Sequence, residues 1–267
     1  MTARSVATIV SLVLLGAVSA CTNFYEVPIE TPIAAKMDVS AFRRVLVAGF
    51  ISGGTDDVDG NLETVRLLRS QLRSKSSLRV IEAEVLPLQE LAAEKVKTAV
   101  GGDRTAQTGA ADAQTPGAPA QEAKIRTEKD LEKYQSIFAD VAFWKKIGEE
   151  HENPLIVTGT VLFTPHQTAG FVTRNQEFYD NLGRRSVVPV RTYMERKGFI
   201  IAPKFIFIDG RTGTTLHSET IREEILYNAQ QNTPALSSYF ELMDKILPTF
   251  LGTLSTQKIR GTRVLLR

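Results

Sequence analysis

The chain has almost no cysteine, since Cys21 is the only one among its 267 residues. A single cysteine excludes an internal disulfide, so the fold must be held by a hydrophobic core. The chain also lacks a basic excess, with 32 Lys and Arg residues against 30 Asp and Glu. Nucleic-acid-binding proteins usually carry a strong excess of basic residues, so we expect no nucleic-acid partner. No stretch after the first 20 residues is apolar enough to span a bilayer as a helix.

Motifs for catalysis and metal binding are also missing. The three histidines, His151, His166 and His217, do not lie at zinc-ligand spacing with one another or with an acid pair. There is no Gly-x-Ser-x-Gly elbow, and no cysteine in a catalytic context. Glu219, Glu223 and Glu224 could form an acid pair, but a solvated strand face fits their spacing better. We therefore predict no catalytic, cofactor or metal site; an envelope enzyme with an unrecognised site is an alternative, because folding can assemble sites that spacing does not reveal.

The N-terminus has the parts of a secretory signal peptide. Arg4 precedes a short apolar run, and small residues precede Cys21. The run is shorter than the roughly 20 residues of a spanning helix. Residues 18–21, Val-Ser-Ala-Cys, resemble the bacterial lipobox, in which the cysteine is acylated, with palmitate among the chains, and becomes the first residue. We predict a signal peptide at 1–20 and lipidation of Cys21; a free thiol near the cleavage site is the alternative.

Cleavage would remove one basic residue and no acid, leaving 31 basic and 30 acidic residues of the original 32 and 30. Several acyl chains hold a protein on a membrane durably, whereas one chain does not. Thr22 follows the cysteine where an inner-membrane retention signal would have Asp. By analogy with enterobacterial sorting, this favours the periplasmic face of the outer membrane. Residues 21–40, with Pro28 and Pro32 and no sustained period, are predicted to be a tether.

The remainder, residues 41–267, is predicted to be a single α/β domain. An apolar run at 43–50, an amphipathic pattern from Asn61 and a second run at 78–81 predict a βαβ unit. Asp59 or Asn61 could cap that helix. The intervening loop, residues 52–57, favours a solvated turn over a phosphate or cation site. Together with the hairpin described next, these patterns predict a three-layer fold, a mixed β-sheet flanked by helices.

Further elements follow along the chain. Pro87 opens a predicted helix that runs to Val100. A Gly-, Pro-, Ala- and Gln-rich stretch at 101–127 predicts a disordered insertion. The patterns then predict a helix from Glu128 to about Ile147 and a strand at 155–163. A strand at 198–208, an Asp-Gly turn and a return strand at 214–227 form a predicted hairpin. A last helix begins at Thr233 and is kinked or divided by Pro248, and a short strand is predicted at 264–266.

Residues 164–197 form a long excursion interrupted by Pro165, Gly170, Gly183 and Pro189. Excursions of this length in a compact domain are often functional. Basic and aromatic residues gather in it, and we predict that they bind a partner: Arg184, Arg185, Arg191, Tyr193 and Arg196. The alternative is that the excursion only packs over the sheet.

Several segments resemble the N-terminal-like domains of TolB and the related core of the curli secretion lipoprotein CsgG. The first strand with its helix resembles the start of those domains. Residues 143–148 leading into 155–161 resemble the helix before their Gly-Thr-Val strand, and residues 205–213 resemble their Thr-Gly hairpin. Asn153-Pro154 replaces the usual Ala-Asp, and Thr214 stands where Glu is frequent. The resemblance implies a periplasmic α/β module that binds proteins or self-assembles, and it transfers no catalytic residue.

The predicted function is therefore a lipid-anchored, non-catalytic docking or assembly component of a cell-envelope machine for secretion, export or wall synthesis. Its partners would be the membrane, through the anchor, and an envelope protein or further copies of the chain. The alternative implied by the resemblance is a subunit of a CsgG-like outer-membrane secretion pore, in which inserted hairpins cross the membrane. Pro165, Pro189 and the arginines interrupt the alternation that such strands need over about 9–11 residues.

Overall fold

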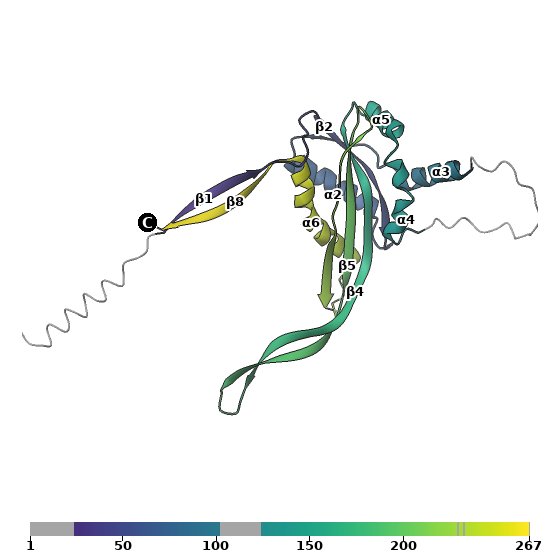
Figure 1. Cartoon of the computed structure of the whole chain (residues 1–267). Helices are drawn as coiled ribbons and strands as arrows, with labels where there is room; N and C mark the ends of the chain where they lie inside the picture. The colour runs from purple at the N-terminus through teal and green to yellow at the C-terminus, as the bar shows by residue number, and fades with distance from the viewer. Residues whose placement is uncertain (1–23, 102–123, 229, 232, 267) are drawn as a thin grey trace, which may run out of the picture. The chain divides into compact units, whose positions relative to one another are not determined.

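The computed structural model describes residues 24–101, 124–228, 230–231 and 233–266. They form two compact units, one of residues 36–255 and one that joins the residues before 36 to those after 255 (Figure 1). The predicted signal peptide, Cys21 and residues 102–123 of the predicted insertion lie outside the described residues. Of the insertion's last residues, Ile125 is buried, and its carbonyl accepts a 2.8 Å hydrogen bond from the Gly54 amide. The folded unit therefore resumes before residue 128.

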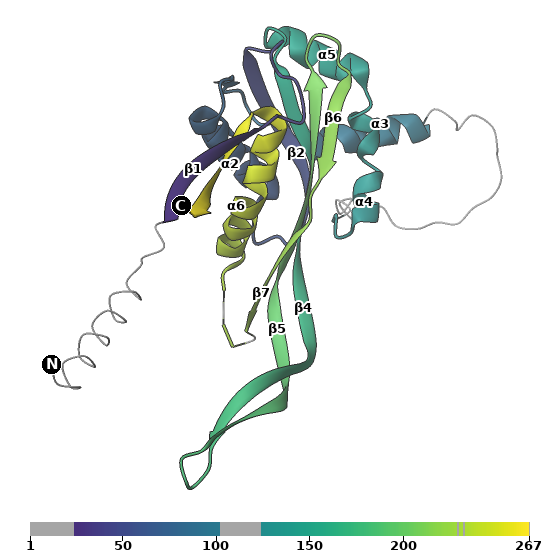
Figure 2. The ribbon, with the colours of Figure 1, turned by 60° about the vertical axis from the view of Figure 1, so that its left-hand side comes forward.

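The larger unit is built on a mixed sheet, as predicted. Its strand order is β3-β2-β4-β5-β6, and β7 also pairs with β5 (Figure 2). The β2 strand runs parallel to β3 and β4, whereas β5 runs antiparallel to β4, β6 and β7. The strands are β2 (Arg44–Gly54), β3 (Arg79–Ile81), β4 (Leu155–Tyr179), β5 (Arg185–Asp209), β6 (Thr215–Thr220) and β7 (Glu223–Asn228).

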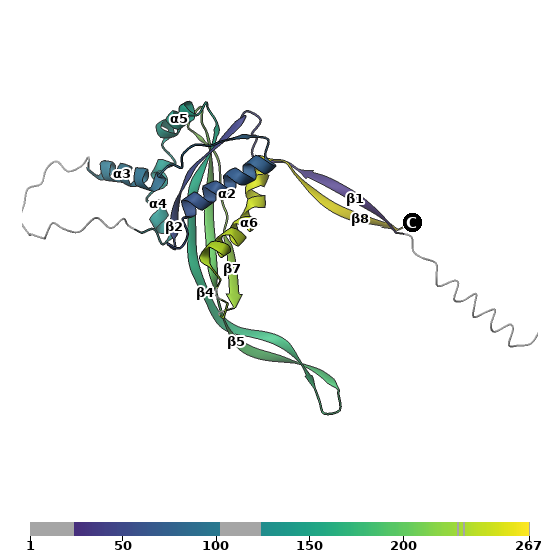
Figure 3. The same ribbon diagram turned by 180° about the vertical axis from the view of Figure 1, so that it is seen from behind.

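Helices cover both faces of this sheet, which confirms the three-layer α/β class. Figure 3 shows α2 and α6 together on one face, and the remaining helices lie on the other. The helices are α2 (Gly60–Lys75), α3 (Leu88–Gly101), α4 (Glu128–Glu132), the 3₁₀ turn η1 (Gln135–Ile137), α5 (Val141–Glu150) and α6 (Ala235–Leu254). Each face has its own apolar cluster, because β2 sends alternate side chains to opposite sides.

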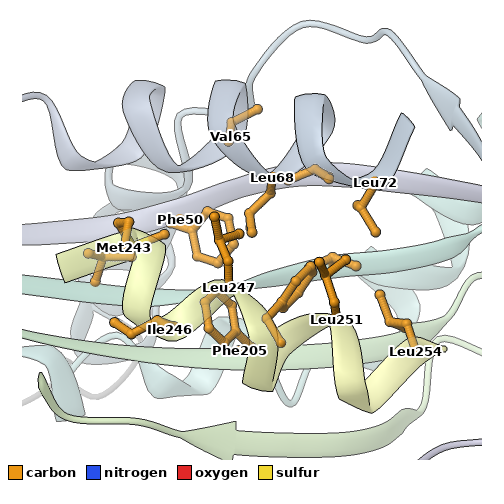
Figure 4. Packing of buried hydrophobic residues seen from close by; sticks show 14 of the residues in the cluster. Phe50, Val65, Leu68, Leu72, Phe205, Met243, Ile246, Leu247, Leu251 and Leu254 are labelled. Atoms are coloured by element: carbon orange, nitrogen blue, oxygen red, sulfur yellow. The ribbon is translucent and has the colours of Figure 1, made fainter. Parts of the chain in front are cut away.

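The first cluster packs α2 and α6 against the sheet. Phe50 from β2 and Phe205 from β5 meet edge to face, with ring centroids 6.0 Å apart. Figure 4 shows the leucines of both helices around these rings. The buried side chains that the helices contribute include Val65, Leu68, Leu72, Met243, Ile246, Leu247, Leu251 and Leu254.

The predicted βαβ unit is confirmed, including the start of its helix. The Asp59 carboxylate accepts a 3.0 Å hydrogen bond from the Leu62 amide, so Asp59 is the N-cap of α2. Asn61, the other predicted cap, instead accepts a 2.8 Å hydrogen bond from the Phe50 amide of β2. The helix is therefore fixed to the strand by its first turn.

The single helix predicted from Glu128 to Ile147 is wrong. The segment forms α4, η1 and α5 in succession. Thr127 and Asp130 form a capping box that starts α4, and Asp140 caps α5 through a 3.0 Å bond from the Phe143 amide. Each new cap starts a new helix axis, and Val141 at the start of α5 is 46% exposed. Trp144 is fully buried and donates a hydrogen bond to the Ile137 carbonyl, so α5 is fixed to η1 through the core.

The tether predicted at residues 21–40 is also wrong over its described part. Residues Phe24–Ile33 form strand β1, which pairs antiparallel with β8 (Gln257–Leu266). The predicted short strand at 264–266 is the end of β8. The domain was predicted to run from 41 to 267, but the larger unit ends at residue 255, because β8 belongs to the second unit. The partner strand lies more than 200 residues away along the chain, so no local pattern could indicate it.

Two predicted elements near the C-terminus are refined. The return strand is divided into β6 and β7, and the break faces Pro203, whose carbonyl accepts a 3.0 Å bond from the Ile221 amide. Pro203 thus lies where β5 needs no ladder donor. Helix α6 runs through Pro248 without division. Its buried side includes Tyr239, Leu242 and Ile246, whereas Leu236 in the first turn is 45% exposed.

Candidate functional site

The predicted excursion is a continuation of the two central strands. The β4–β5 ladder runs without a register shift from Leu155↔Asp209 to Tyr179↔Arg185. Strand β2 accompanies β4 only as far as Phe163, and β7 accompanies β5 only from Ile201 to Arg196. The hairpin therefore leaves the sheet as a two-stranded arm (Figure 1). We call residues 166–195 the distal hairpin; the alternative in which the excursion packs over the sheet is wrong.

Both outer edges of the distal hairpin are open. Within the described part of the chain, no strand pairs with β4 beyond Phe163 or with β5 between Arg185 and Glu195. An open strand edge presents unpaired N–H and C=O groups in a row, and so it is a template for a further strand. Soluble proteins usually shorten or cover such edges.

One face of the distal hairpin carries an exposed aromatic pair. Phe171 and Tyr193 are directly opposite in the ladder, and their rings meet edge to face with centroids 5.4 Å apart. The two side chains are 66% and 54% exposed. The Arg191 guanidinium lies 5.5 Å from the centre of the Phe171 ring. Exposed aromatic and arginine side chains of this kind are typical of the energetically dominant residues in protein interfaces.

The opposite face is more apolar. Because facing residues share a side, the even-numbered positions of both strands lie together. Val172, Val190 and Met194 on this face are half-buried, and Val188 is 44% exposed. Between positions 170–178 and 186–194, Arg174 is the only charged residue of this face. The odd-numbered face has two over the same spans, Glu177 and Arg191.

Asp180 fixes the tip of the hairpin. Its carboxylate accepts hydrogen bonds from the Leu182 and Arg184 amides at 2.9 and 2.8 Å, and from the Arg184 guanidinium at 2.6 Å. These bonds, led by the Arg184 amide, lower the pKa of Asp180. Gly183, at φ +74°, supplies the left-handed residue of the turn. The tip is thus a defined turn held by a charged hydrogen-bond acceptor.

The five residues predicted to bind a partner do not form one patch. Arg184 is paired with Asp180 at the tip, and Arg185 forms an ion pair with Glu177. Arg191 and Tyr193 lie together on the odd-numbered face, whereas Arg196 lies on the even-numbered face beside β7. Among the described residues, Arg191 and Arg196 have no acidic partner. Phe171, which completes the aromatic pair, was missed, because only the strand register places it opposite Tyr193.

The acids considered as a catalytic pair are separated by the break between β6 and β7. Glu219 accepts hydrogen bonds from Lys36 and from Thr253, the latter at 2.9 Å. Partial burial opposes its ionisation, but the bonds from Lys36 and Thr253 outweigh that effect and lower the pKa of Glu219. In the 52–57 loop, Asp56 pairs with Lys124, and Asp57 accepts a bond from Thr55. The described residues contain no group of three His, Cys, Asp or Glu side chains arranged to hold a metal ion.

No helix in the described part of the chain is both long and apolar enough to cross a membrane. No family model matches the sequence, and no curated protein matches it. Among solved structures, the crystal structure of lipoprotein GNA1162 from Neisseria meningitidis aligns with 78% of this chain and 96% of its own, at 12% identity and a TM-score of 0.31. A score this low does not show a shared fold. The resemblance to TolB N-terminal-like domains and CsgG stays a prediction.

Proposed function

We propose that this protein is a lipid-anchored component of the bacterial cell envelope, facing the periplasm from the outer membrane, and that it acts without catalysis by assembling with other proteins. The anchor rests on the signal-peptide pattern and on Cys21. The assembly role rests on the distal hairpin, which leaves the core with two open edges and an exposed aromatic pair. These edges fit a further strand, supplied by an envelope protein or by another copy of the chain.

The experiment compares one disruptive variant with one matched control. The double variant Arg191→Glu with Tyr193→Ala removes the cation and one ring of the exposed face, so capture of partners or of further copies should fall about tenfold, the equivalent of about 1.4 kcal/mol. Lys146→Glu, an exposed charge reversal on α5, is the control and should leave capture unchanged. Cross-linking in intact cells, followed by purification, measures both. Equal capture by the double variant and the native chain would show that the distal hairpin does not bind partners or further copies.

A second function, a subunit of a membrane secretion pore, is favoured by the length and sidedness of the same hairpin. Residues 167–179 alone exceed the roughly 9–11 residues that a membrane-crossing strand requires. Pro165 lies at the base of the distal hairpin, and two of the arginines that seemed to interrupt the alternation, Arg185 and Arg191, lie on the odd-numbered face. Over residues 170–178 and 186–194, the even-numbered face carries one charged residue, Arg174.

Conductance across planar bilayers separates the two functions. A pore predicts ion currents from the native protein, and Val190→Lys, which puts a charge on the apolar face, should abolish them. Thr173→Lys, on the odd-numbered face, is the matched control and should leave the currents in place. If the native protein conducts no ions, the second function is excluded and the assembly role stands by itself.

A further inference from the structure

The second unit, the β1–β8 ribbon, has two chemically different faces. Facing residues again share a side, so the odd-numbered positions of both strands lie together. That side carries mostly apolar residues, with Arg263 opposite Val27 as the charged one; the apolar residues are Tyr25, Val27, Ile29, Ile33 and Ile259. The even-numbered side carries charges, with Glu30 paired to Arg260 at 2.8 Å and to Lys258 at 3.5 Å.

The apolar side of the ribbon is open. Tyr25 is 72% exposed, Ile259 56% and Ile33 46%. An isolated two-stranded ribbon is marginally stable in water. The ion pairs of the other side are exposed and contribute little. A contiguous apolar face of this kind marks an interaction surface.

The position of the ribbon in the chain indicates what covers this face. Tyr25 follows Cys21 by four residues, so even a fully extended chain keeps it within about 14 Å of that residue. If Cys21 is acylated, as the proposed function states, the start of β1 is held at the lipid headgroups. Tyrosine is enriched at that depth of a membrane. Arg263 is the charged residue of the odd-numbered side, opposite Val27, and a cation at this position favours an anionic lipid surface.

A second copy of the chain fits the ribbon less well. Pro28 and Pro32 lie within β1, and proline has no N–H to donate to a ladder. They are tolerated because their positions face away from β8, on the outer edge of β1. That edge therefore lacks two donors for a strand from another copy, a device that blunts edge-to-edge pairing.

We infer that the β1–β8 ribbon is a membrane-surface element, which lies along the bilayer with its odd-numbered face in the headgroup region and its charged face toward water. This rests on the proposed lipid anchor for its location, but the sidedness is a property of the ribbon itself. The ribbon would turn a flexible single-point attachment into an oriented one, because a flat face contacts the membrane next to the anchor.

The test places a tryptophan on each face of the acylated full-length protein. Ile259→Trp reports from the apolar face, and Thr262→Trp, three residues along β8 and also exposed, reports from the charged face. Ile29→Trp repeats the first report from the other strand in case Ile259→Trp folds poorly. Vesicles of phosphatidylethanolamine and phosphatidylglycerol carry brominated acyl chains, which quench a nearby tryptophan. The native Trp144 is fully buried and gives a constant background.

The expected result is quenching that is several-fold stronger for Ile259→Trp and Ile29→Trp than for Thr262→Trp. Equal quenching of the two faces, or none while the protein floats with the vesicles, would overturn the inference and leave the anchor intact. A blue-shifted but unquenched Ile259→Trp would mean that protein covers the face, which also overturns it. If the chain bears no acyl label, the proposed anchor is wrong, and sided quenching by added vesicles then decides the ribbon alone.

Discussion

The proximal and distal halves of the β4–β5 hairpin share one unbroken register but lie in opposite surroundings. In the proximal half, residues 155–163 and 200–209, strands and helices cover both edges and both faces, and nearly every side chain is buried. In the distal half, the same ladder continues with open edges and exposed side chains. The comparison teaches that the core fixes the register, and that backbone pairing carries this register outward to place exposed residues.

Replacing one glycine in each half by alanine should give the largest difference in stability between the two halves. Gly159 has φ +146°, and a Cβ there would lie 1.8 Å from the Lys204 carbonyl oxygen of the neighbouring strand. Gly159→Ala should destabilise the fold by about 4 kcal/mol or more, because backbone must move. Gly170→Ala in the distal half meets nothing within 4 Å and should be close to neutral. Urea denaturation of both variants measures the difference; similar midpoints would show that the proximal half is not rigid.

A pair of phenylalanines gives the next largest difference. Phe205 is 1% exposed and contacts the rings of Phe50 and Phe250, whereas Phe171 is 66% exposed. Phe205→Ala should lower the free energy of unfolding by about 3–5 kcal/mol through the cavity it leaves. Phe171→Ala should change it by less than about 0.5 kcal/mol. A large loss from Phe171→Ala would mean that the distal hairpin contributes to global stability.

The pH dependence of stability tests how Tyr239 of α6 is buried against the proximal half. Its ring meets Phe163 edge to face at 5.2 Å, and burial raises the pKa of its hydroxyl above the usual value near 10. The folded state therefore keeps this proton where the unfolded state loses it, so stability should fall as pH rises above about 10. Denaturation of the native chain and Tyr239→Phe between about pH 9 and pH 11 isolates the effect. Parallel pH profiles would contradict it.

Asp180 gives the smallest, purely local effect in the distal half. Hydrogen bonds from the Arg184 amide and guanidinium lower the pKa of this carboxylate, so its contribution is present above the usual value near 4 and lost as pH falls through the lowered one. Asp180→Asn should speed amide exchange at Leu182 and Arg184 without shifting the global unfolding midpoint. Leu182 and Arg184 exchanging at native rates in the variant would show that other contacts hold the tip.

Local patterns predicted the elements whose partners lie nearby in sequence. The buried run at 43–50, the periodic helix with its Asp59 cap and the Asp-Gly turn at 209–210 each occur in the structure close to where they were expected. The segment from 128 was wrongly predicted as one helix, because Asp140 was read as an interior residue and not as the cap of α5. The partner-binding residues were found as a cluster in sequence, but strand parity separates Arg191 from Arg196.

The sequence by itself determined the α/β class, the two-sided burial of β2 and the signal-peptide pattern ahead of Cys21, since periodicity, turn chemistry and capping act within a few residues. Only the tertiary structure decided that residues 24–33 pair with 257–266, that the excursion is an arm with open edges, and that Phe171 faces Tyr193. Strand pairing depends on contacts between residues far apart along the chain. A strand's own residues show its alternation but not its neighbour.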